Sequence, residues 1–261
     1  MTILDELAAY ARERVEKAKA AKPLETIREE ALAIDTPTDK RFAFEKALLT
    51  PGVSFICECK KASPSKGVIA ENFPYLEIAR SYEAAGADAI SVLTEPKWFK
   101  GSEAYLKEIA ADVKIPVLRK DFTVDEYMIY EAKVLGASAV LLIVSLLSED
   151  KIREYIGICD ELGLSALVEC HDEAEIETAL KAGARVVGVN NRNLKDFTVD
   201  IELAGRLRAL VPEGVAYVSE SGITGEKDME LVREIKADAV LIGEAMMRAE
   251  NKAEFLNRLK A

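Results

Sequence analysis

Short apolar runs rich in β-branched residues recur along the chain, and the segments between them carry apolar residues at helical spacing. The helical spacing is clear in Tyr75, Ile78, Ala79 and Tyr82, which share one face of a helix. Strand and helix therefore alternate along the whole chain, a pattern typical of parallel sheets with helical crossovers. The pattern predicts eight strands, at Val53–Cys57, Ala89–Leu93, Pro116–Leu118, Ala139–Val144, Ala166–Val168, Val186–Val189, Val215–Val218 and Ala239–Ile242.

The predicted strands are apolar throughout rather than at alternate positions. The run Val140–Val144 has no polar residue, which indicates burial on both faces, as in a parallel sheet. A repeated Gly-Ala turn, at Gly86, Gly136 and Gly183, closes helices that precede strands. No Gly-x-Gly-x-x-Gly follows the first strand, so a dinucleotide-binding sheet would lack its phosphate turn. We therefore predict an α/β fold in which residues 1–261 form a single (β/α)8 TIM-barrel domain.

Residues 1–50 precede the first strand and are predicted to form an N-terminal helical extension. The pattern predicts a helix within residues 2–22 and a short helical element within residues 40–48. The extension either covers one mouth of the barrel or plugs its bottom, and the sequence leaves both options open. Residues 2–22 carry charges throughout, so they form neither a signal peptide nor a membrane span.

Composition narrows the classes of partner. The chain has 35 Lys and Arg against 46 Asp and Glu, a net charge of −11, which argues against nucleic acid and anionic membranes but leaves room for a local phosphate pocket. Its four cysteines lack paired spacing and it has one histidine, so we expect reduced cysteines and no metal. We expect a cytoplasmic protein.

Charged and polar residues cluster where the predicted strands end. After the first strand, a period of two places Glu58 and Lys60 on one side and the neighbouring cysteines on the other. Four later strands each end in a polar or charged residue: Lys120, Glu169, Asn190 and Glu220. Because all carboxyl ends of a parallel barrel lie on one face, these groups are predicted to form the catalytic centre. For Glu58 and Lys60 alone, a purely structural ion pair remains an alternative.

Two turns predict a phosphate site. Ser221-Gly222 follows the seventh strand and Gly243-Glu244 follows the eighth, and each leads toward a helix. Barrels of this class often bind phosphate with backbone amides at these two places. Glycine allows phosphate oxygens to approach those amides closely.

With these motifs assembled, the chain resembles the indole-3-glycerol phosphate synthase family over nearly its whole length. The resemblance implies a substrate, 1-(2-carboxyphenylamino)-1-deoxyribulose 5-phosphate, and the products indole-3-glycerol phosphate, carbon dioxide and water. It implies neither a metal nor an organic cofactor. The motifs that carry it are Glu-Cys-Lys-Lys-Ala-Ser-Pro-Ser at 58–65, Leu-Thr-Glu-Pro at 93–96, Phe-Lys-Gly-Ser at 99–102, Leu-Arg-Lys-Asp-Phe at 118–122, Leu-Leu-Ile-Val at 141–144, Val-Glu at 168–169, Gly-Val-Asn-Asn-Arg-Asn-Leu at 188–194, Ser-Glu-Ser-Gly at 219–222 and Leu-Ile-Gly-Glu at 241–244.

The resemblance also implies roles for single residues. Lys120 matches the general acid that protonates the substrate carbonyl, Glu169 the acid–base glutamate, and Lys60, partnered by Glu58, a lysine for dehydration and anchoring. Asn190 completes the set that we expect to be catalytic. The expected substrate-binding residues are Ser63 and Arg192 for the carboxylate, Phe99, Phe122, Leu141 and Leu194 for the aromatic ring, Glu220 for the polar wall, and Ser221, Gly222, Gly243 and Glu244 for the phosphate, with Trp98 as a further residue at the mouth.

Local chemistry adds two expectations. A lysine needs burial or a positive neighbour to become an acid near neutral pH. Arg119 should point away from Lys120 by strand alternation, so Lys60 is predicted to be that neighbour. His171 follows Glu169 by two positions, but we expect the strand to have ended, which makes it a loop residue.

Two other functions fit the same residues. The first is an aldolase-type lyase in which Lys120 or Lys60 forms a Schiff base with a sugar phosphate. The second is a barrel that binds phosphorylated ligands without turnover, against which the complete acid and base set argues. In each case the partner is a small phosphorylated molecule, and we expect a monomer with which pathway enzymes could associate.

Overall fold

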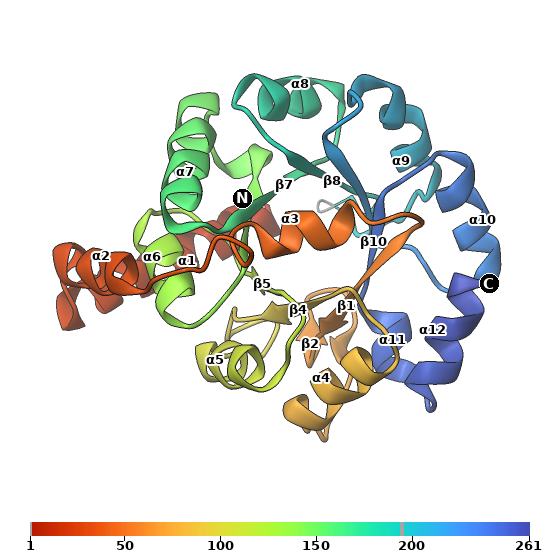
Figure 1. Ribbon diagram of the computed structural model, residues 1–261, viewed down its shortest axis with the longest axis horizontal. Coiled ribbons are helices and arrows are strands. Elements are labelled where there is room, and N and C mark those ends of the chain that lie inside the picture. The colour runs from red at the N-terminus through yellow and green to blue at the C-terminus, as the bar shows by residue number, and fades with distance from the viewer. Residues whose placement is uncertain (1, 194–195) are drawn as a thin grey trace.

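The computed structural model describes residues 2–193 and 196–261, and within them eight parallel strands close into a TIM barrel (Figure 1). The order around the barrel is β1-β10-β9-β8-β7-β6-β5-β4, and β1 closes the ring by pairing with both β10 and β4. All eight predicted strands are confirmed, with ends that differ by up to two residues. They are β1 Ser54–Cys59, β4 Ala89–Leu93, β5 Val117–Lys120, β6 Ala139–Ile143, β7 Ser165–Cys170, β8 Val186–Asn190, β9 Ala216–Glu220 and β10 Ala239–Ile242.

Helices surround the barrel because each strand buries its outward side chains against the helix that follows. On β1, Phe55, Cys57 and Cys59 pack toward the helices, whereas Ile56 joins the cluster that fills the lumen. The four cysteines are buried and free, as predicted. The helices are α4 Tyr75–Ala84, α5 Glu103–Asp112, α6 Tyr127–Val134, α7 Glu149–Leu162, α8 Glu173–Lys181, α9 Glu202–Leu207, α10 Glu226–Glu234, α11 Glu244–Arg248 and α12 Lys252–Lys260, with 3-10 turns η1 Val144–Leu146 and η2 Arg208–Leu210.

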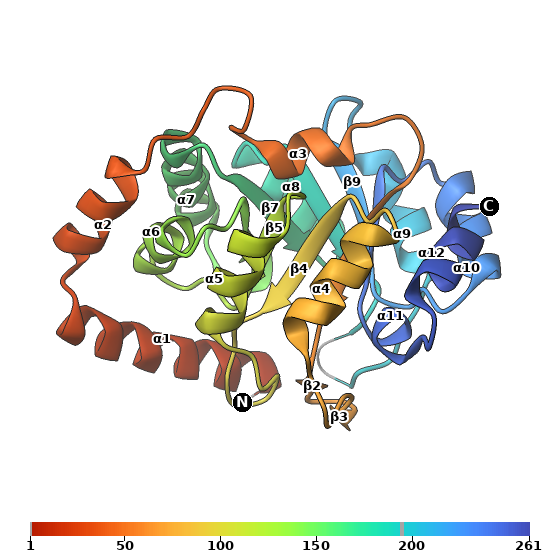
Figure 2. The ribbon, with the colours of Figure 1, turned by 60° about the horizontal axis from the view of Figure 1, so that its bottom comes forward.

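The N-terminal extension reaches both ends of the barrel (Figure 2). Helix α3, Ala43–Leu48, plugs the amino ends of the strands: Phe44 and Leu48 are fully buried in the lumen cluster, and the amide of Glu45 donates to Ser165 Oγ at 3.1 Å. Helix α1, Ile3–Ala21, lies across the opposite end, where Leu7 lines the mouth. The sequence left open whether the extension covers the mouth or plugs the bottom of the barrel. The extension does both, with α1 at the mouth and α3 at the bottom.

Two predictions about the extension need correction. The short helix begins at Ala43 rather than near Lys40. A further helix, α2 Leu24–Ala33, joins the other two along the side of the barrel and packs against α6. Its apolar stripe was too thin to predict it, because only Ile27 and Ala31 are buried among charged neighbours. A hairpin of two short strands, β2 Ala62–Ser63 and β3 Gly67–Val68, was also not predicted.

Candidate active site

A cavity of about 980 Å³ opens at the carboxyl ends of the strands. Apart from Trp98, it is lined by every predicted site residue that the structure describes, whereas Leu194 lies outside the described residues. The first residues of α1 complete its wall through Ile3, Leu4 and Leu7. The predicted residues at the cavity are Glu58, Lys60, Ser63, Phe99, Lys120, Phe122, Leu141, Glu169, Asn190, Arg192, Glu220, Ser221, Gly222, Gly243 and Glu244.

Lys120 lies at the centre of the polar wall. As the last residue of β5 it points inward, and its Nζ lies 3.0 Å from Glu169 Oε2 and 3.3 Å from Glu220 Oε2. The other oxygen of Glu169 accepts a 3.2 Å hydrogen bond from Asn190 Nδ2. Three strands, β5, β7 and β8, thus contribute a lysine, a carboxylate and an amide in direct contact, and β9 adds a second carboxylate.

The charges in this cluster displace one another's pKa values. Burial alone would lower the pKa of Lys120, but Glu169, Glu220 and Glu58 outweigh burial and hold it above its ordinary value. Burial would raise the pKa of Glu169, yet Lys120 and then His171 lower it to about 2. The lysine is therefore protonated and Glu169 is ionised.

Glu220 differs from Glu169 although both contact the same lysine. Burial, reinforced by the charge of Glu169 and opposed by Lys120, raises the pKa of Glu220 to about 7. Its Oε1 is buried and has no hydrogen-bond partner among residues 2–193 and 196–261. This carboxyl group can therefore gain or lose a proton near neutral pH, next to Lys120.

Lys60 and Glu58 form the predicted pair, with Nζ 2.7 Å from Oε1. The second oxygen of Glu58 accepts from Ser91 Oγ at 3.2 Å. Burial raises the pKa of Glu58, but Lys60 and Lys120 outweigh it and hold the pKa below its usual range. The prediction that Lys60 makes Lys120 acidic is wrong for this state, because the carboxylates around Lys120 raise its pKa.

The opposite wall is apolar. The rings of Phe99 and Phe122 are 6.0 Å apart and tilted by 42°, and Leu141 is buried beside them on β6. Arg192 lines the cavity and donates through Nη1 to the carbonyl of Phe197 at 3.2 Å, while Ser63 is buried in the β2–β3 hairpin. These residues would place a flat aromatic group between apolar side chains, with polar groups at its edge.

Trp98 does not line the cavity. Its ring instead packs edge-on against Tyr10 of α1, with centroids 5.6 Å apart, and the Nζ of Lys97 lies 4.2 Å from its centroid. The tryptophan therefore supports the helix over the mouth rather than the substrate slot.

Each of the two predicted phosphate turns has one position that requires glycine. Gly222 has φ +90°, a conformation that side chains disfavour. A Cβ on Gly243 would lie 2.5 Å from Glu58 Oε1 and 2.8 Å from Lys60 Nζ, so glycine lets the ion pair lie against the turn. Ser221 adopts φ +66°, and Glu244 pairs with Arg248 at 3.0 Å.

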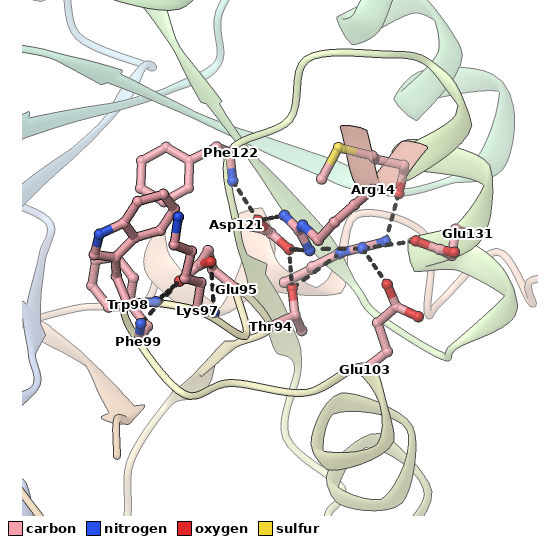
Figure 3. Close-up of polar contacts among 12 residues, drawn as sticks. Arg14, Thr94, Glu95, Lys97, Trp98, Phe99, Glu103, Asp121, Phe122 and Glu131 are labelled. Atoms are coloured by element: carbon pink, nitrogen blue, oxygen red, sulfur yellow. Dashed lines mark hydrogen bonds and ion pairs between the residues drawn. The ribbon is translucent and has the colours of Figure 1, made fainter. Parts of the chain in front are cut away.

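The outward face of β5 carries a second buried cluster (Figure 3). Arg119 points away from the cavity, as predicted, and lies 2.7 Å from Glu131 of α6. Asp121 receives a two-pronged contact from Arg14 of α1, at 2.6 and 3.1 Å, and a 2.5 Å hydrogen bond from Thr94. The amide of Phe122 donates to the same carboxylate at 2.8 Å. This cluster joins the helix over the mouth to the strand that carries Lys120.

Sequence reasoning missed Gly188 and underrated His171. A Cβ on Gly188, in β8, would lie 2.1 Å from Glu220 Oε1, so only glycine leaves room for that side chain. The available signal was a glycine inside a buried strand. His171 is a loop residue, as predicted, but its ring reaches back to within 3.5 Å of Glu169.

No helix among the described residues is long and apolar enough to cross a membrane. Across residues 2–193 and 196–261, no group of three or more His, Cys, Asp or Glu side chains is arranged to hold a metal ion.

The barrel architecture is shared with many solved structures. Similar chains include 3-hexulose-6-phosphate synthase from Salmonella typhimurium, with a TM-score of 0.64 and 15% identity over 80% of this chain and 97% of that chain. KGPDC from Streptococcus mutans has a TM-score of 0.63 and 13% identity over 80% of this chain and 95% of that chain. At these identities the similarity concerns the fold alone.

Sequence relatives are far closer. The family model for indole-3-glycerol phosphate synthase matches residues 4–259. A protein with that name from Ruminiclostridium cellulolyticum is 55% identical over 258 residues, which cover 99% of this chain and 98% of that protein. Another from Endomicrobium trichonymphae is 54% identical over 259 residues, which cover 99% of each. The chain therefore belongs to the indole-3-glycerol phosphate synthase family and is a carboxy-lyase of tryptophan biosynthesis.

Proposed function

We propose that this cavity closes the indole ring with Lys120 as the proton donor and Glu169 as the base. The observation that carries the proposal is the position of Lys120, a buried cation held between two carboxylates and facing an aromatic slot. The reaction converts 1-(2-carboxyphenylamino)-1-deoxyribulose 5-phosphate into indole-3-glycerol phosphate, carbon dioxide and water.

Ring closure begins when the aromatic carbon that bears the carboxylate attacks the ketone carbon. As this bond forms, the ketone oxygen takes a proton from Lys120 and becomes a hydroxyl group. The bond from the ring carbon to the carboxylate then breaks, and its electrons return to the ring as carbon dioxide leaves. The hydroxyl departs as water after gaining a proton, while a base removes one from the ring system.

Proton transfer from Lys120 also prepares the second half of the reaction. The charge of Lys120 is the chief group that lowers the pKa of Glu169. Once the lysine has given up its proton, that influence disappears and Glu169 becomes a stronger base. Glu220, whose pKa is about 7, can return a proton to the lysine. Lys60, paired with Glu58, supplies a second ammonium group for dehydration.

Binding follows the division of the cavity into two walls. We propose that the aromatic ring of the substrate lies among Phe99, Phe122 and Leu141, with Leu194 as a further expected contact. Ser63 and Arg192 would bind its carboxylate, since an arginine fork suits that group. At the other end the turns at Ser221–Gly222 and Gly243–Glu244, with Lys60, would bind the phosphate.

The Schiff-base alternative gains no support from the geometry. An imine requires a neutral amine, whereas the carboxylates around Lys120 raise its pKa and keep it charged. Borohydride added with a ketose phosphate should therefore trap no covalent adduct. Capture of an adduct on Lys120 or Lys60 would favour the lyase.

The proposed function is tested by incubating the purified protein with its substrate and following the fluorescence of indole-3-glycerol phosphate. Steady formation of that product, with one carbon dioxide released for each molecule, is expected. Absence of product would overturn the proposal. We further propose that residues 1–261 act as one domain and as a cytoplasmic monomer, which sedimentation of the active protein can test.

A further inference from the structure

His171 occupies the loop after β7 and is the one histidine of the chain. Its Nδ1 lies 3.2 Å from Glu175 Oε2, and its backbone amide donates to the same oxygen at 2.7 Å. Its Nε2 is buried, makes no hydrogen bond to any residue that the structure describes and lies 3.5 Å from Glu169 Oε1. The imidazole therefore stands between two carboxylates, one on the first turn of α8 and one in the active site.

The two oxygens of Glu169 have different surroundings. Oε2 lies against Lys120, the group proposed to exchange a proton with the substrate. Oε1 accepts from Asn190 at 3.2 Å and is the oxygen toward which His171 points. The side of Glu169 away from Lys120 is thus held by groups that take no part in the proposed proton transfers.

Three carboxylates face the imidazole, from three elements: Glu169 of β7, Glu175 of α8 and Glu220 of β9. Glu175 is itself fixed by Ser145 of η1, whose Oγ donates to it at 2.5 Å. Burial lowers the pKa of His171, but the contact with Glu175 and the charges of Glu169 and Glu220 outweigh burial and raise it above its ordinary value.

Only the imidazolium can serve both neighbours. A protonated ring has two N–H donors, one for each carboxylate, whereas a neutral ring has one donor and one lone pair. If the neutral ring keeps its bond to Glu175, its lone pair at Nε2 faces Glu169 Oε1. Loss of the proton would therefore replace an attractive contact with a repulsive one and push Glu169 away from Asn190.

We propose that His171 is a positioning residue that holds Glu169 through Oε1, and that loss of its proton sets the alkaline limit of kcat. This role rests on the proposed function of Glu169 as the base. Holding Glu169 requires protonated His171. The value of kcat should therefore be retained below the pKa of the imidazole and should fall as the pH rises through that pKa.

The single histidine makes the test direct. In protein labelled with ¹³C-histidine, the Hε1–Cε1 signal reports the pKa of His171 without interference from other rings. We expect this pKa to coincide with the alkaline limb of kcat in the unmodified enzyme. In Glu175→Gln, which removes one of the facing charges, both should move to lower pH together by about one unit. Glu177→Gln, on an exposed position of the same helix, should move neither.

His171→Gln supplies the second readout, since glutamine offers an N–H donor that does not titrate. We expect kcat at pH 7 to fall about tenfold, KM to change little, and the alkaline limb to disappear. An alkaline limb unmoved in both variants, or one that differs from the NMR pKa of the unmodified enzyme, would overturn this role. A protein that forms no indole-3-glycerol phosphate at any pH would instead refute the proposed function, and the NMR titration does not depend on turnover.

Discussion

Two buried clusters of charge lie at the end of β5, one on each side of the chain. Toward the cavity, Lys120 lies between Glu169 and Glu220. Toward the helices, Asp121 receives Arg14, with Arg119 3.8 Å away. The clusters are built from adjacent residues and use the same kinds of charge. The inner cluster is proposed to move protons, whereas the outer cluster joins two parts of the fold.

The difference lies in which groups can release a proton. Arginine keeps its charge at any ordinary pH, and its fork fits a carboxylate with two contacts. Burial raises the pKa of Asp121, but Arg14 and then Arg119 outweigh it and lower the pKa. The inner cluster instead uses lysine, whose ammonium group can give up a proton. A buried charge cluster therefore braces a fold when its cations are permanent, and is suited to react when they are not.

Replacing the central cation should have the largest effect. Lys120→Met should lower kcat by about 10² to 10⁴-fold, the usual contribution of a general acid, while substrate binding is spared. Single-turnover fluorescence measures the chemical step, and calorimetry with the product measures binding. Lys114→Met, at an exposed position ahead of the same strand, is the control and should keep full activity. An unchanged turnover number in Lys120→Met would remove the lysine from the mechanism.

Breaking the outer cluster should affect stability before chemistry. Asp121→Asn leaves Arg14 and Arg119 without their shared carboxylate and should reduce the free energy of unfolding by about 3–5 kcal/mol. Urea denaturation measures this loss. Asp112→Asn is the control, because Arg80 also makes two hydrogen bonds to Asp112, through Nε and Nη2, but at an exposed site. Equal losses in both variants would show that burial does not distinguish the two pairs.

A substitution at Gly188 can displace the Glu220 side chain while every charged residue is kept. In Gly188→Ala the new Cβ would lie 2.1 Å from Glu220 Oε1, so the carboxylate must leave its place beside Lys120. A displacement of about 1 Å at a catalytic site costs about 100-fold in rate, and a loss of that order is expected in kcat. Gly157→Ala, in α7 with nothing within 4 Å of the new Cβ, should leave kcat unchanged. Full activity in Gly188→Ala would show that the position of Glu220 is unimportant.

The smallest expected effect concerns pH and stability. The pKa of Glu220 is raised to about 7 in the folded protein, so folding favours its protonated form. Its contribution to stability must then decline as the pH rises from its unfolded pKa toward 7. Glu220→Gln removes this decline. Urea denaturation at pH 5 and pH 8 should therefore show a smaller loss in the variant than in the unmodified protein, and identical losses would contradict the raised pKa.

Much of the comparison between the clusters could be predicted from the sequence. Strand alternation correctly placed Arg119 and Lys120 on opposite faces, because a period of two follows from backbone geometry alone. The convergence of strand ends likewise brought Glu58, Glu169 and Glu220 to one cavity. These predictions depend on local pattern and on the topology of a parallel barrel, both of which the sequence carries.

Contacts between distant segments could not be predicted in the same way. Nothing near Arg14 in the sequence indicates Asp121, because the pairing depends on where α1 lies against the barrel. The pKa of Lys120 was predicted in the wrong direction because the balance among three carboxylates and two lysines depends on distances of a few ångströms. The fit of Glu220 over Gly188 depends on packing between neighbouring strands.

The contact between α1 and β5 also bears on the order of folding. Arg14 and Asp121 are 107 residues apart, so during synthesis helix α1 must wait for a long stretch of chain before its partner exists. Until then its apolar face, Leu7, Ala11 and Val15, has no barrel to cover. Closing so long a loop carries an entropic cost that earlier contacts do not share. Helix α1 should therefore dock late, and the cavity should gain its wall only after most of the barrel has formed.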